Sequence, residues 1–328
     1  VEKKLVSSGL GDNLLYYIPM TGRVLVDLLK VVQSGGYRLP IYKLDYVCNH
    51  FLHKRKNDLP PQKIFIYQKG SDQDRATIAR YCLIDCILCN RLIDKLEILT
   101  NNIGMSRVCS VPLSYLFLRG QGIKIFSFLS KICRKENYLI KTKDKNDAKD
   151  QEGYEGAIVL EPEKGIYFEA SVVADFNSLY PSCMIAWNLS HDSYIEIGGK
   201  YDNLPEGQYY DVEYDLYRME EIPGRVAKQK VKYGVKTCRF YQPSDGSKSL
   251  VPRVLNSLLA ARKNTRKEQK AFVKGTFEWN VKEGLQLAYK VTANSVYGQI
   301  GAPTSSVFLK DIAACTTACG RGLIYSSK

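Results

Sequence analysis

The sequence VVADFNSLYPS at residues 172–182 places a carboxylate directly after an apolar run. The run predicts a strand that ends at Asp175, and Pro181 suits the first position of a helix, where its missing N–H is harmless. Residues 176–180 would then form a turn whose backbone N–H groups can bind phosphate oxygens, beside a carboxylate that can hold Mg²⁺. An aspartate that merely caps the helix is an equally good interpretation of these residues alone.

Two arginines are predicted on the inner face of a helix over residues 250–274. At about 100° per residue, Arg262 and Arg266 continue the apolar stripe that starts at Val251. Arginines that face inward need an anion. The lysines on the flank of this helix are better explained as a solvated face.

A second helix is predicted over about residues 276–298. Its helical wheel brings the side chains of Lys290, Asn294 and Tyr297 within about 60° of one another. Gly298 follows, where a helix can end or another group can approach the backbone closely. Next to two inward arginines, these side chains would form a triphosphate pocket. A polar helix face with an ordinary C-cap fits the spacing equally well.

The elements that must position these residues are predicted from periodicity. Residues 73–99 lack Gly and Pro and predict a long helix, in which Asp85 breaks an apolar stripe and so needs a reason to be there. The segments AIVLEP and IYFEASVVADF, joined by the turn EKG, predict antiparallel strands that lead to Asp175. Residues 198–247 predict a peripheral hairpin region. Residues 141–153 have almost no apolar side chains and predict a solvated linker.

Composition limits the classes of protein to which the chain can belong. Its 328 residues suggest about two domains, and 45% apolar with 25% charged residues exclude a disordered chain. No stretch is apolar enough to predict a membrane span. The charge of +13 favours a polyanionic partner, although a membrane surface would attract it too. Ten cysteines without a signal peptide indicate reduced thiols inside a cell, and a start without Met suggests a piece of a longer chain.

Taken in order, these motifs resemble those of family B DNA polymerases. DFNSLYPS at 175–182 is similar to their motif A, KVTANSVYG at 290–298 to motif B, and LLAARKNTRK at 258–267 to the basic fingers helix. GYEGA at 153–157 resembles the Y-x-G-G/A motif between the exonuclease and polymerase regions. YCLID at 81–85 resembles the third exonuclease motif, Y-x3-D, which would explain the unusual acid.

The resemblance also implies a branch and a fold. VPLSYLFLRGQ at 111–121 is similar to the delta-like branch, and departures from cellular delta sequences suggest a large DNA virus of eukaryotes. The implied fold class is α+β and multidomain: the C-terminal part of an RNase H-like exonuclease domain, a palm of antiparallel sheet with helices, and a two-helix fingers subdomain, with the thumb absent. The implied boundaries are 1–100 for the exonuclease part, 101–152 for a connecting segment, 153–247 for the first part of the palm with motif A, 248–298 for the fingers helices with motif B, and 299–328 for a truncated second part of the palm.

In such polymerases, two Mg²⁺ ions assist the attack of a primer 3′-hydroxyl on a deoxynucleoside triphosphate. The resemblance implies that Asp175 binds metal and that the backbone at Ser178 and Leu179 contacts the triphosphate. It also implies that Tyr180 is the sugar gate, whose ring occupies the space that a ribose 2′-hydroxyl needs.

The remaining polymerase roles fall on the two helices. By the resemblance, Arg262, Arg266 and Lys290 would bind triphosphate oxygens, and Lys290 would donate a proton to the leaving group. Asn294 would help to hold the nucleotide. Tyr297 would pack with Gly298 at the nascent base pair.

The resemblance places further roles in the exonuclease part and at the linking motif. Asp85 would bind a metal ion, and Tyr81 would orient the water that attacks DNA. Tyr154 and Gly156 would contact the DNA backbone.

Two departures from the family pattern matter. The second carboxylate motif, Y-G-D-T-D-S, has no match, because the only Asp after residue 245 is Asp311 in FLKDIAAC. The D-x-E exonuclease motif is missing as well. One carboxylate cannot hold two Mg²⁺ ions about 4 Å apart, so we expect these 328 residues alone neither to extend nor to degrade DNA.

Other interpretations need to be weighed. Cys82, Cys86 and Cys89 have the C-x3-C-x2-C spacing of some iron–sulfur sites, although three small core residues explain them better. A non-catalytic DNA-binding scaffold related to polymerases is the alternative function, against which the intact Asp175 and Lys290 argue. The expected partners are primer–template DNA, deoxynucleoside triphosphates and a processivity factor, with no membrane. The expected location is intracellular, in the nucleus or at a viral replication site.

Overall fold

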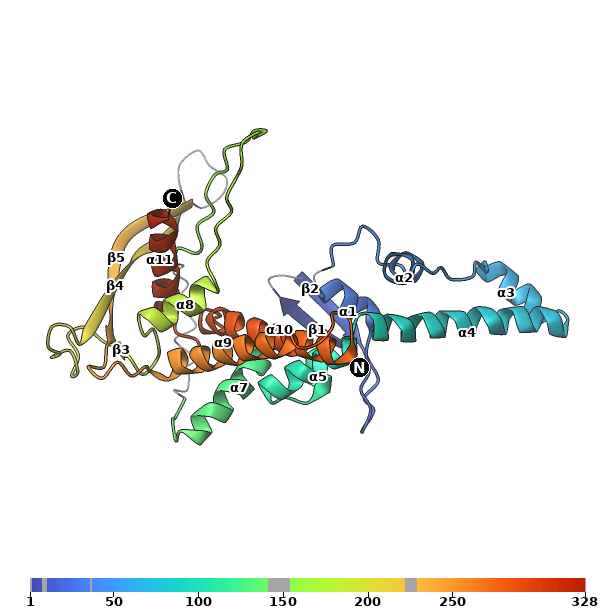
Figure 1. Cartoon of the computed structure of the whole chain (residues 1–328), viewed down its shortest axis with the longest axis horizontal. Helices are drawn as coiled ribbons and strands as arrows, with labels where there is room; N and C mark the ends of the chain where they lie inside the picture. Colours follow the sequence, from blue (N-terminus) through green and yellow to red (C-terminus); the bar gives the residue numbers. More distant parts are fainter. Residues whose placement is uncertain (1, 8–10, 36, 141–153, 222–228, 328) are drawn as a thin grey trace. The chain divides into compact units, whose positions relative to one another are not determined.

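The computed structural model describes residues 2–7, 11–35, 37–140, 154–221 and 229–327 (Figure 1). The chain divides into two compact units: unit 1 comprises residues 1–120 with 268–288, and unit 2 comprises residues 121–267 with 289–328. The linker predicted for residues 141–153 lies outside the described residues, together with Gly153, the first residue of the segment GYEGA. The domain boundaries that the sequence implies therefore stay predictions.

Unit 1 is a β-hairpin followed by helices. Its elements are β1 (Glu2–Ser7), β2 (Gly11–Tyr16), α1 (Leu28–Ser34), α2 (Leu44–Leu52), α3 (Pro61–Gln68), α4 (Asp72–Lys95), α5 (Ile98–Cys109) and α6 (Leu113–Leu118). Its core joins α1, α2 and α4 through buried apolar side chains, namely Val32, Val47, Cys48, Leu88 and Leu92. Among the described residues, no helix is both long and apolar enough to cross a bilayer.

The long helix predicted over residues 73–99 is confirmed as α4. It begins at a capping box, in which Ser71 and Asp74 satisfy each other's backbone N–H groups. It ends at Lys95, four residues before the predicted end, and α5 starts at Ile98. Glu97 between them has a left-handed φ of 50°, which an uninterrupted helix would not allow.

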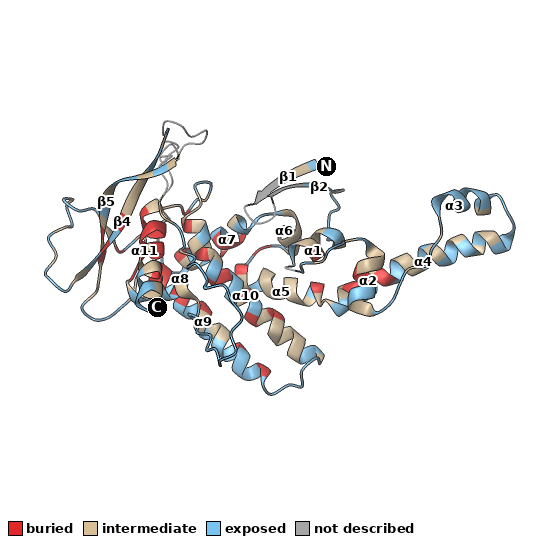
Figure 2. Ribbon diagram, turned by 90° about the horizontal axis from the view of Figure 1, so that it is seen from above, coloured by how far each residue is buried: buried red, intermediate tan, exposed pale blue. Residues whose placement is uncertain are grey.

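Unit 2 combines a three-stranded sheet with helices. Its elements are α7 (Gln121–Lys135), α8 (Leu179–Ala186), β3 (Tyr194–Ile195), β4 (Tyr209–Glu220), β5 (Gln229–Tyr241), parts of α9 (Leu250–Gln269) and α10 (Phe277–Ile300), and α11 (Lys310–Ser326). The sheet order is β3-β5-β4 and all pairs are antiparallel. The helix α11 packs against β4 and α8, and Figure 2 shows buried residues concentrated along α11.

A buried carboxylate ties α11 to all three strands. Asp311, in the first turn of α11, accepts hydrogen bonds from the Tyr194 hydroxyl on β3 at 2.8 Å and the Tyr214 hydroxyl on β4 at 2.7 Å. Lys236 Nζ on β5 donates to both carboxyl oxygens at 2.9 Å. Burial alone would raise the pKa of Asp311, but these three donors hold the pKa below its ordinary value. Asp311 is therefore a structural residue of the sheet–helix interface.

The two helices predicted near the C-terminal end are confirmed as α9 and α10. The turn between them contains Gly275, whose φ of 92° is a conformation that favours glycine. The hairpin predicted within residues 198–247 is confirmed as β4–β5, in which a register irregularity falls between Leu216 and Tyr217.

The strands predicted on the way to Asp175 are wrong. Residues 157–175 run out and back as a long extended excursion at the top of Figure 1, but they have no strand assignment. Their apolar side chains are exposed, for example Phe168 at 96% and Val172 at 95%. An alternating pattern forms a ladder only where a second strand offers backbone partners, and the described residues supply none along this segment. The mixed helix-and-sheet fold class holds, but the observed sheet lies elsewhere, in β3–β5.

Candidate functional site

The turn that carries Asp175 leads directly into α8. Ser178 precedes the helix with a left-handed φ of 53°, and Leu179 is its first residue. Pro181 is thus the third helical position and not the first. This placement is harmless for the same reason, because the N–H groups of the first turn have no partner within the helix. Ser182 Oγ donates to the Asn177 carbonyl at 2.9 Å and fixes the turn.

Asp175 is exposed and lines an open pocket of about 370 Å³ in unit 2. The other lining residues are Leu160, Ala174, Phe176, Leu179, Ile324 and Ser327. The pocket therefore joins the carboxylate to the N-terminus of α8, where positive partial charge favours an anion. The cationic residues of α9 and α10 are not among the described residues that line it.

Three tyrosines from three separate motifs meet beside α8. The rings of Tyr180 and Tyr297 have centroids 4.4 Å apart at an interplanar angle of 42°. Tyr154 forms a side-chain hydrogen bond with Tyr297. Burial, reinforced by this neighbour, raises the pKa of Tyr297 well above its ordinary value, and burial also raises the pKa of Tyr180. The structure thus brings the Y-x-G-G/A motif, motif A and motif B together at one aromatic cluster.

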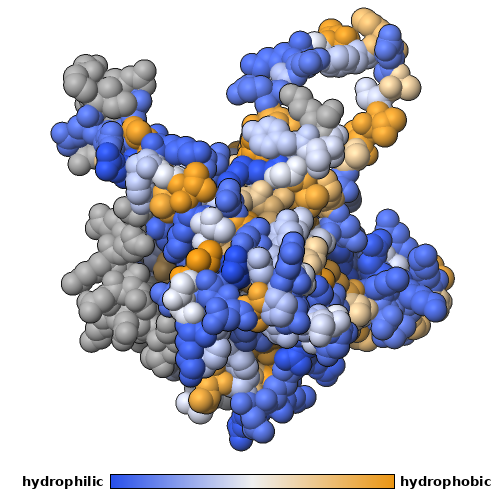
Figure 3. All heavy atoms as spheres, turned by 90° about the vertical axis from the view of Figure 1, so that its left-hand side faces the viewer, coloured by the Kyte–Doolittle hydropathy of each residue, from blue (hydrophilic) through white to orange (hydrophobic). Residues whose placement is uncertain are grey.

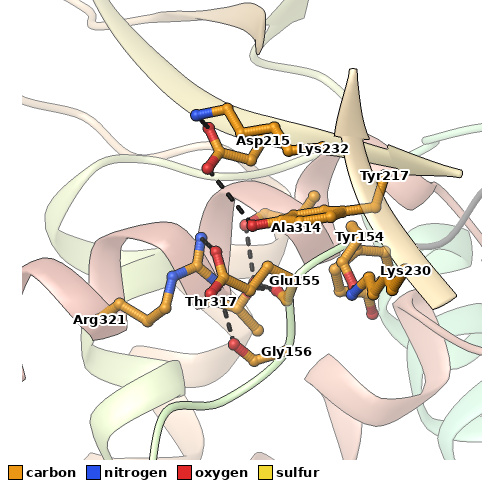
Figure 4. Close-up of polar contacts among 10 residues, drawn as sticks. All are labelled: Tyr154, Glu155, Gly156, Asp215, Tyr217, Lys230, Lys232, Ala314, Thr317 and Arg321. Carbon is orange, nitrogen blue, oxygen red and sulfur yellow. Dashed lines mark hydrogen bonds and ion pairs between the residues drawn. The ribbon is translucent and has the colours of Figure 1, made fainter. Parts of the chain in front are cut away.

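The segment that carries Tyr154 is held by α11, as Figure 4 shows. Thr317 Oγ1 donates to the Glu155 carbonyl at 2.8 Å. Arg321 Nη1 donates to the carbonyls of Glu155 and Gly156 at 2.8 and 2.9 Å, and its other terminal nitrogen lies 3.3 Å from the Glu155 carboxylate. These contacts fix the backbone at Glu155 and Gly156.

The hairpin supplies a further contact to this segment. Lys230 Nζ donates to the Tyr154 carbonyl at 3.0 Å and lies 4.4 Å from the centre of the Tyr217 ring. Lys232 pairs with Asp215 at 2.7 Å on the same part of the hairpin (Figure 4). Sequence reasoning missed Thr317 and Arg321, although their i, i+4 spacing on a helix would have placed both on one face.

The motif B residues of α10 share an exposed row. Lys290, Asn294 and Gly298 are exposed and four residues apart, so they lie one above another on the helix. The helix continues to Ile300, so the interpretation of Gly298 as a helix end is wrong. A side chain at Gly298 would meet nothing within 4 Å, which leaves the backbone open to approach.

The arginines of α9 differ from each other. Arg262 is half-buried, as predicted for a residue near the apolar stripe, but Arg266 is exposed, so the prediction that it faces inward is wrong. Thr265 takes the buried place instead and donates to the Ala261 carbonyl at 2.9 Å. A hydroxyl that bonds its own helix can be buried at little cost, whereas a guanidinium there would need an anion.

In unit 1, Tyr81 and Asp85 lie one turn apart on α4. Lys56 Nζ lies 5.6 Å from the centre of the Tyr81 ring, and the Lys56 backbone N–H donates to Asp45 at 3.0 Å. A hydrogen bond with Tyr81, aided by the charges of Asp85 and Asp45, raises the pKa of Lys56. One buried carboxyl oxygen of Asp85, Oδ1, has no hydrogen-bond partner among the described residues, which is unusual for a buried polar atom.

The predicted metal ligands fit metal ions only in part. Asp175 and Asp85 each offer a carboxylate, but no group of three or more His, Cys, Asp or Glu in the described parts of the chain could hold a metal ion. This finding also overturns the iron–sulfur interpretation. Cys82 and Cys86 are exposed, so they are not core residues either.

Comparisons with known proteins agree with this geometry. The model of DNA polymerase family B matches residues 111–328. The chain is 42% identical to a DNA polymerase of Pyramimonas orientalis virus, covering 100% of this chain and 35% of that protein. It is 35% identical to the DNA polymerase delta catalytic subunit of Caenorhabditis elegans, covering 100% and 28%.

Solved structures give the same result. The family B DNA polymerase of the archaeon Pyrobaculum calidifontis is similar with a TM-score of 0.64 and 26% identity, over 93% of this chain and 36% of that one. The chain thus spans about a third of the length of the relatives that it matches.

Proposed function

Because the chain belongs to DNA polymerase family B, we propose that it supplies the nucleotide-binding side of a DNA-directed DNA polymerase. The observation that carries the proposal is the meeting of Tyr154, Tyr180 and Tyr297 beside the carboxylate-bearing turn of α8. Motifs that lie far apart in sequence are brought together there, which is the arrangement expected of residues that share one ligand.

Motif A takes the phosphates and the sugar. The backbone N–H groups at Ser178 and Leu179 bind triphosphate oxygens, since they stand at the N-terminus of α8. Tyr180 excludes a 2′-hydroxyl by the volume of its ring. Asp175 supplies one metal ligand. When bound, two Mg²⁺ ions would supply activation of the primer hydroxyl and neutralisation of the leaving group.

The helices α9 and α10 add cations and the base-pair contact. Lys290 is exposed on α10 and binds the triphosphate oxygens. It also donates a proton to the leaving group as that group forms. Arg262 and Arg266 bind the same oxygens as forked donors. Asn294 holds the nucleotide, and the open backbone at Gly298, with Tyr297, lets the nascent base pair pack closely.

We also propose a proofreading role for unit 1. The unpartnered oxygen of Asp85 would bind a metal ion, and Tyr81 would orient the attacking water. Tyr154 and Gly156 of unit 2 would contact the DNA backbone. The further proposed partners are a primer–template and a processivity factor. The proposed location is the nucleus or a viral replication site, and the proposed source is a large DNA virus of eukaryotes.

The scaffold alternative predicts no triphosphate binding. The test is isothermal titration of the 328-residue chain with Mg²⁺-dATP, in which binding should weaken at least about tenfold in Lys290→Ala. Lys263→Ala is the control, because this exposed lysine stands on α9 next to Arg262 and should bind as the unaltered chain does. Titration without heat in the unaltered chain would favour the scaffold.

A primer-extension assay tests the catalytic part. We expect no extension by the 328-residue chain, because Asp175 is its only proposed polymerase carboxylate. Robust extension would contradict the requirement for a second one. A polymerase that carries this chain together with a D-T-D motif should extend the primer, and Asp175→Asn should abolish that extension.

A further inference from the structure

Gly320, in the middle of α11, leaves room for the ring of Tyr180. A Cβ atom built at Gly320 would lie 3.0 Å from Tyr180 Cε1 and 3.7 Å from Leu179 Cδ2. Carbon atoms in contact normally lie about 3.5–4.0 Å apart. Any larger residue at this buried position would therefore have to move the Tyr180 ring by some tenths of an ångström.

The ring has little freedom to absorb such a movement. Tyr180 is half-buried and packs against the Tyr297 ring at 4.4 Å. Tyr297 is itself hydrogen-bonded to Tyr154, whose carbonyl accepts a hydrogen bond from Lys230. The next residue, Glu155, is held through its carbonyl by Arg321. A displacement of Tyr180 would thus meet a chain of packed groups and not open solvent.

A glycine in a helix interior otherwise has a cost. It destabilises a helix by roughly 0.5–1 kcal/mol relative to alanine, and α11 contains a second one, Gly322, at which a Cβ would meet nothing within 4 Å. The two glycines therefore differ in one respect that matters here: only Gly320 touches the residue proposed as the sugar gate.

We propose that Gly320 is a positioning residue for sugar discrimination, which sets the Tyr180 ring at the depth that admits a deoxyribonucleoside triphosphate and rejects a ribonucleoside triphosphate. This inference rests on the proposed role of Tyr180. Gly320 touches no substrate itself and acts through the ring. A misplacement of about 1 Å can cost about a hundredfold in rate, so a smaller displacement of the ring should still change selectivity measurably.

The experiment compares Gly320→Ala with Gly322→Ala in a polymerase that carries this chain. Both changes add one methyl group to the same helix and raise its intrinsic stability equally. The measurement is kcat/KM for a deoxynucleotide and for the matching ribonucleotide. We expect the ratio of the two to shift about tenfold in Gly320→Ala and to stay within about twofold of the unaltered enzyme in Gly322→Ala. Equal ratios in both variants would overturn the inference.

A double variant separates this inference from the proposed gate. If the ring transmits the effect, Gly320→Ala should change nothing further in a Tyr180→Ala background. A shift that persists there would overturn the inference. If Tyr180→Ala itself keeps full discrimination, the gate assignment fails and the inference falls with it.

Folding provides an independent readout. If Gly320→Ala alone fails to fold, the double variant with Tyr180→Ala should fold, because the ring that the new methyl group would meet is gone. Thermal melting followed by circular dichroism measures the folding of both variants. If the double variant also fails to fold, the clash lies with other atoms and the inference is wrong.

Discussion

Two aspartates of unit 2 occupy opposite environments. Asp175 is exposed and stands at the mouth of a pocket, whereas the Asp311 side chain is only 13% exposed and accepts four hydrogen bonds from three side chains. A carboxylate saturated by fixed donors has no coordination left for a metal, while an open one does. The surroundings of the two aspartates, and not their residue type, therefore decide which of them can bind a metal ion.

The first prediction concerns Asp311→Asn. We expect a loss of about 2 kcal/mol in the free energy of unfolding near pH 7, because Lys236 and two tyrosine hydroxyls lose a charged acceptor. The matched control is Asp215→Asn, whose pair with Lys232 is more exposed and should cost about 0.5 kcal/mol or less. Denaturant unfolding of both variants measures the difference.

The pH dependence of that loss follows from the lowered pKa. The stabilisation by Asp311 is present above the ordinary aspartate pKa of about 3.9 and is lost as the pH falls through the lower pKa of the folded protein. The gap between the unaltered chain and Asp311→Asn should therefore close below about pH 3.9. A gap that widens on acidification would contradict the assignment.

The second prediction concerns the sugar gate. Tyr180→Ala in a polymerase that carries this chain should admit ribonucleotides at least about tenfold more readily, because the ring volume is removed. Tyr180→Phe keeps the ring and should keep the discrimination. Competition between the two nucleotides in primer extension measures it, and unchanged selectivity in the alanine variant would show that another group is the gate.

Single residues were predictable where a motif names them, and less so where packing decides. Asp175, Tyr180 and Lys290 could be singled out by type and spacing. Thr317 and Arg321 could not, because their partners are backbone carbonyls more than 160 residues away. The orientation of Arg266 was missed because a helical wheel cannot tell which of two adjacent positions, Thr265 or Arg266, the neighbouring elements cover.

At the scale of elements, α11 acts as a support for the segment that carries Tyr154. The third prediction is that Arg321→Met increases hydrogen–deuterium exchange at residues 154–157, because two carbonyls lose their charged donor. Arg253→Met is the control, since its pair with Glu136 lies at the surface, and it should leave exchange at 154–157 unchanged. Equal exchange in the two variants would contradict the supporting role.

Element prediction succeeded where the stabilising interactions are local. The helix α4 and the pair α9–α10 have their periodicity, caps and turn glycine within the sequence window itself. The strands predicted within 157–175 failed because a strand depends on a partner that the local sequence does not specify. In the sheet that does form, β4 and β5 are successive strands that pair along their length, so most of this sheet is a local hairpin.

At the scale of the whole molecule, the excess of 13 positive charges predicts DNA binding that is governed by phosphates. The fourth prediction is that duplex affinity of the chain falls about a hundredfold between about 50 and 200 mM salt, as roughly four phosphate contacts would give. Duplexes of scrambled sequence should bind equally well. Fluorescence anisotropy measures both, and binding that ignores salt would contradict the electrostatic account.

The extended excursion of residues 157–175 presents Val159, Ile166, Phe168, Val172 and Val173 to solvent, each at least 84% exposed. Figure 3 shows hydrophobic side chains on the projection at the top of the molecule. Extended backbone without strand partners, next to exposed apolar side chains, favours self-association between copies of the chain. A concentrated solution of this polypeptide should therefore aggregate on storage and become turbid, whereas a dilute solution should stay clear. A mild detergent should slow the rise in turbidity.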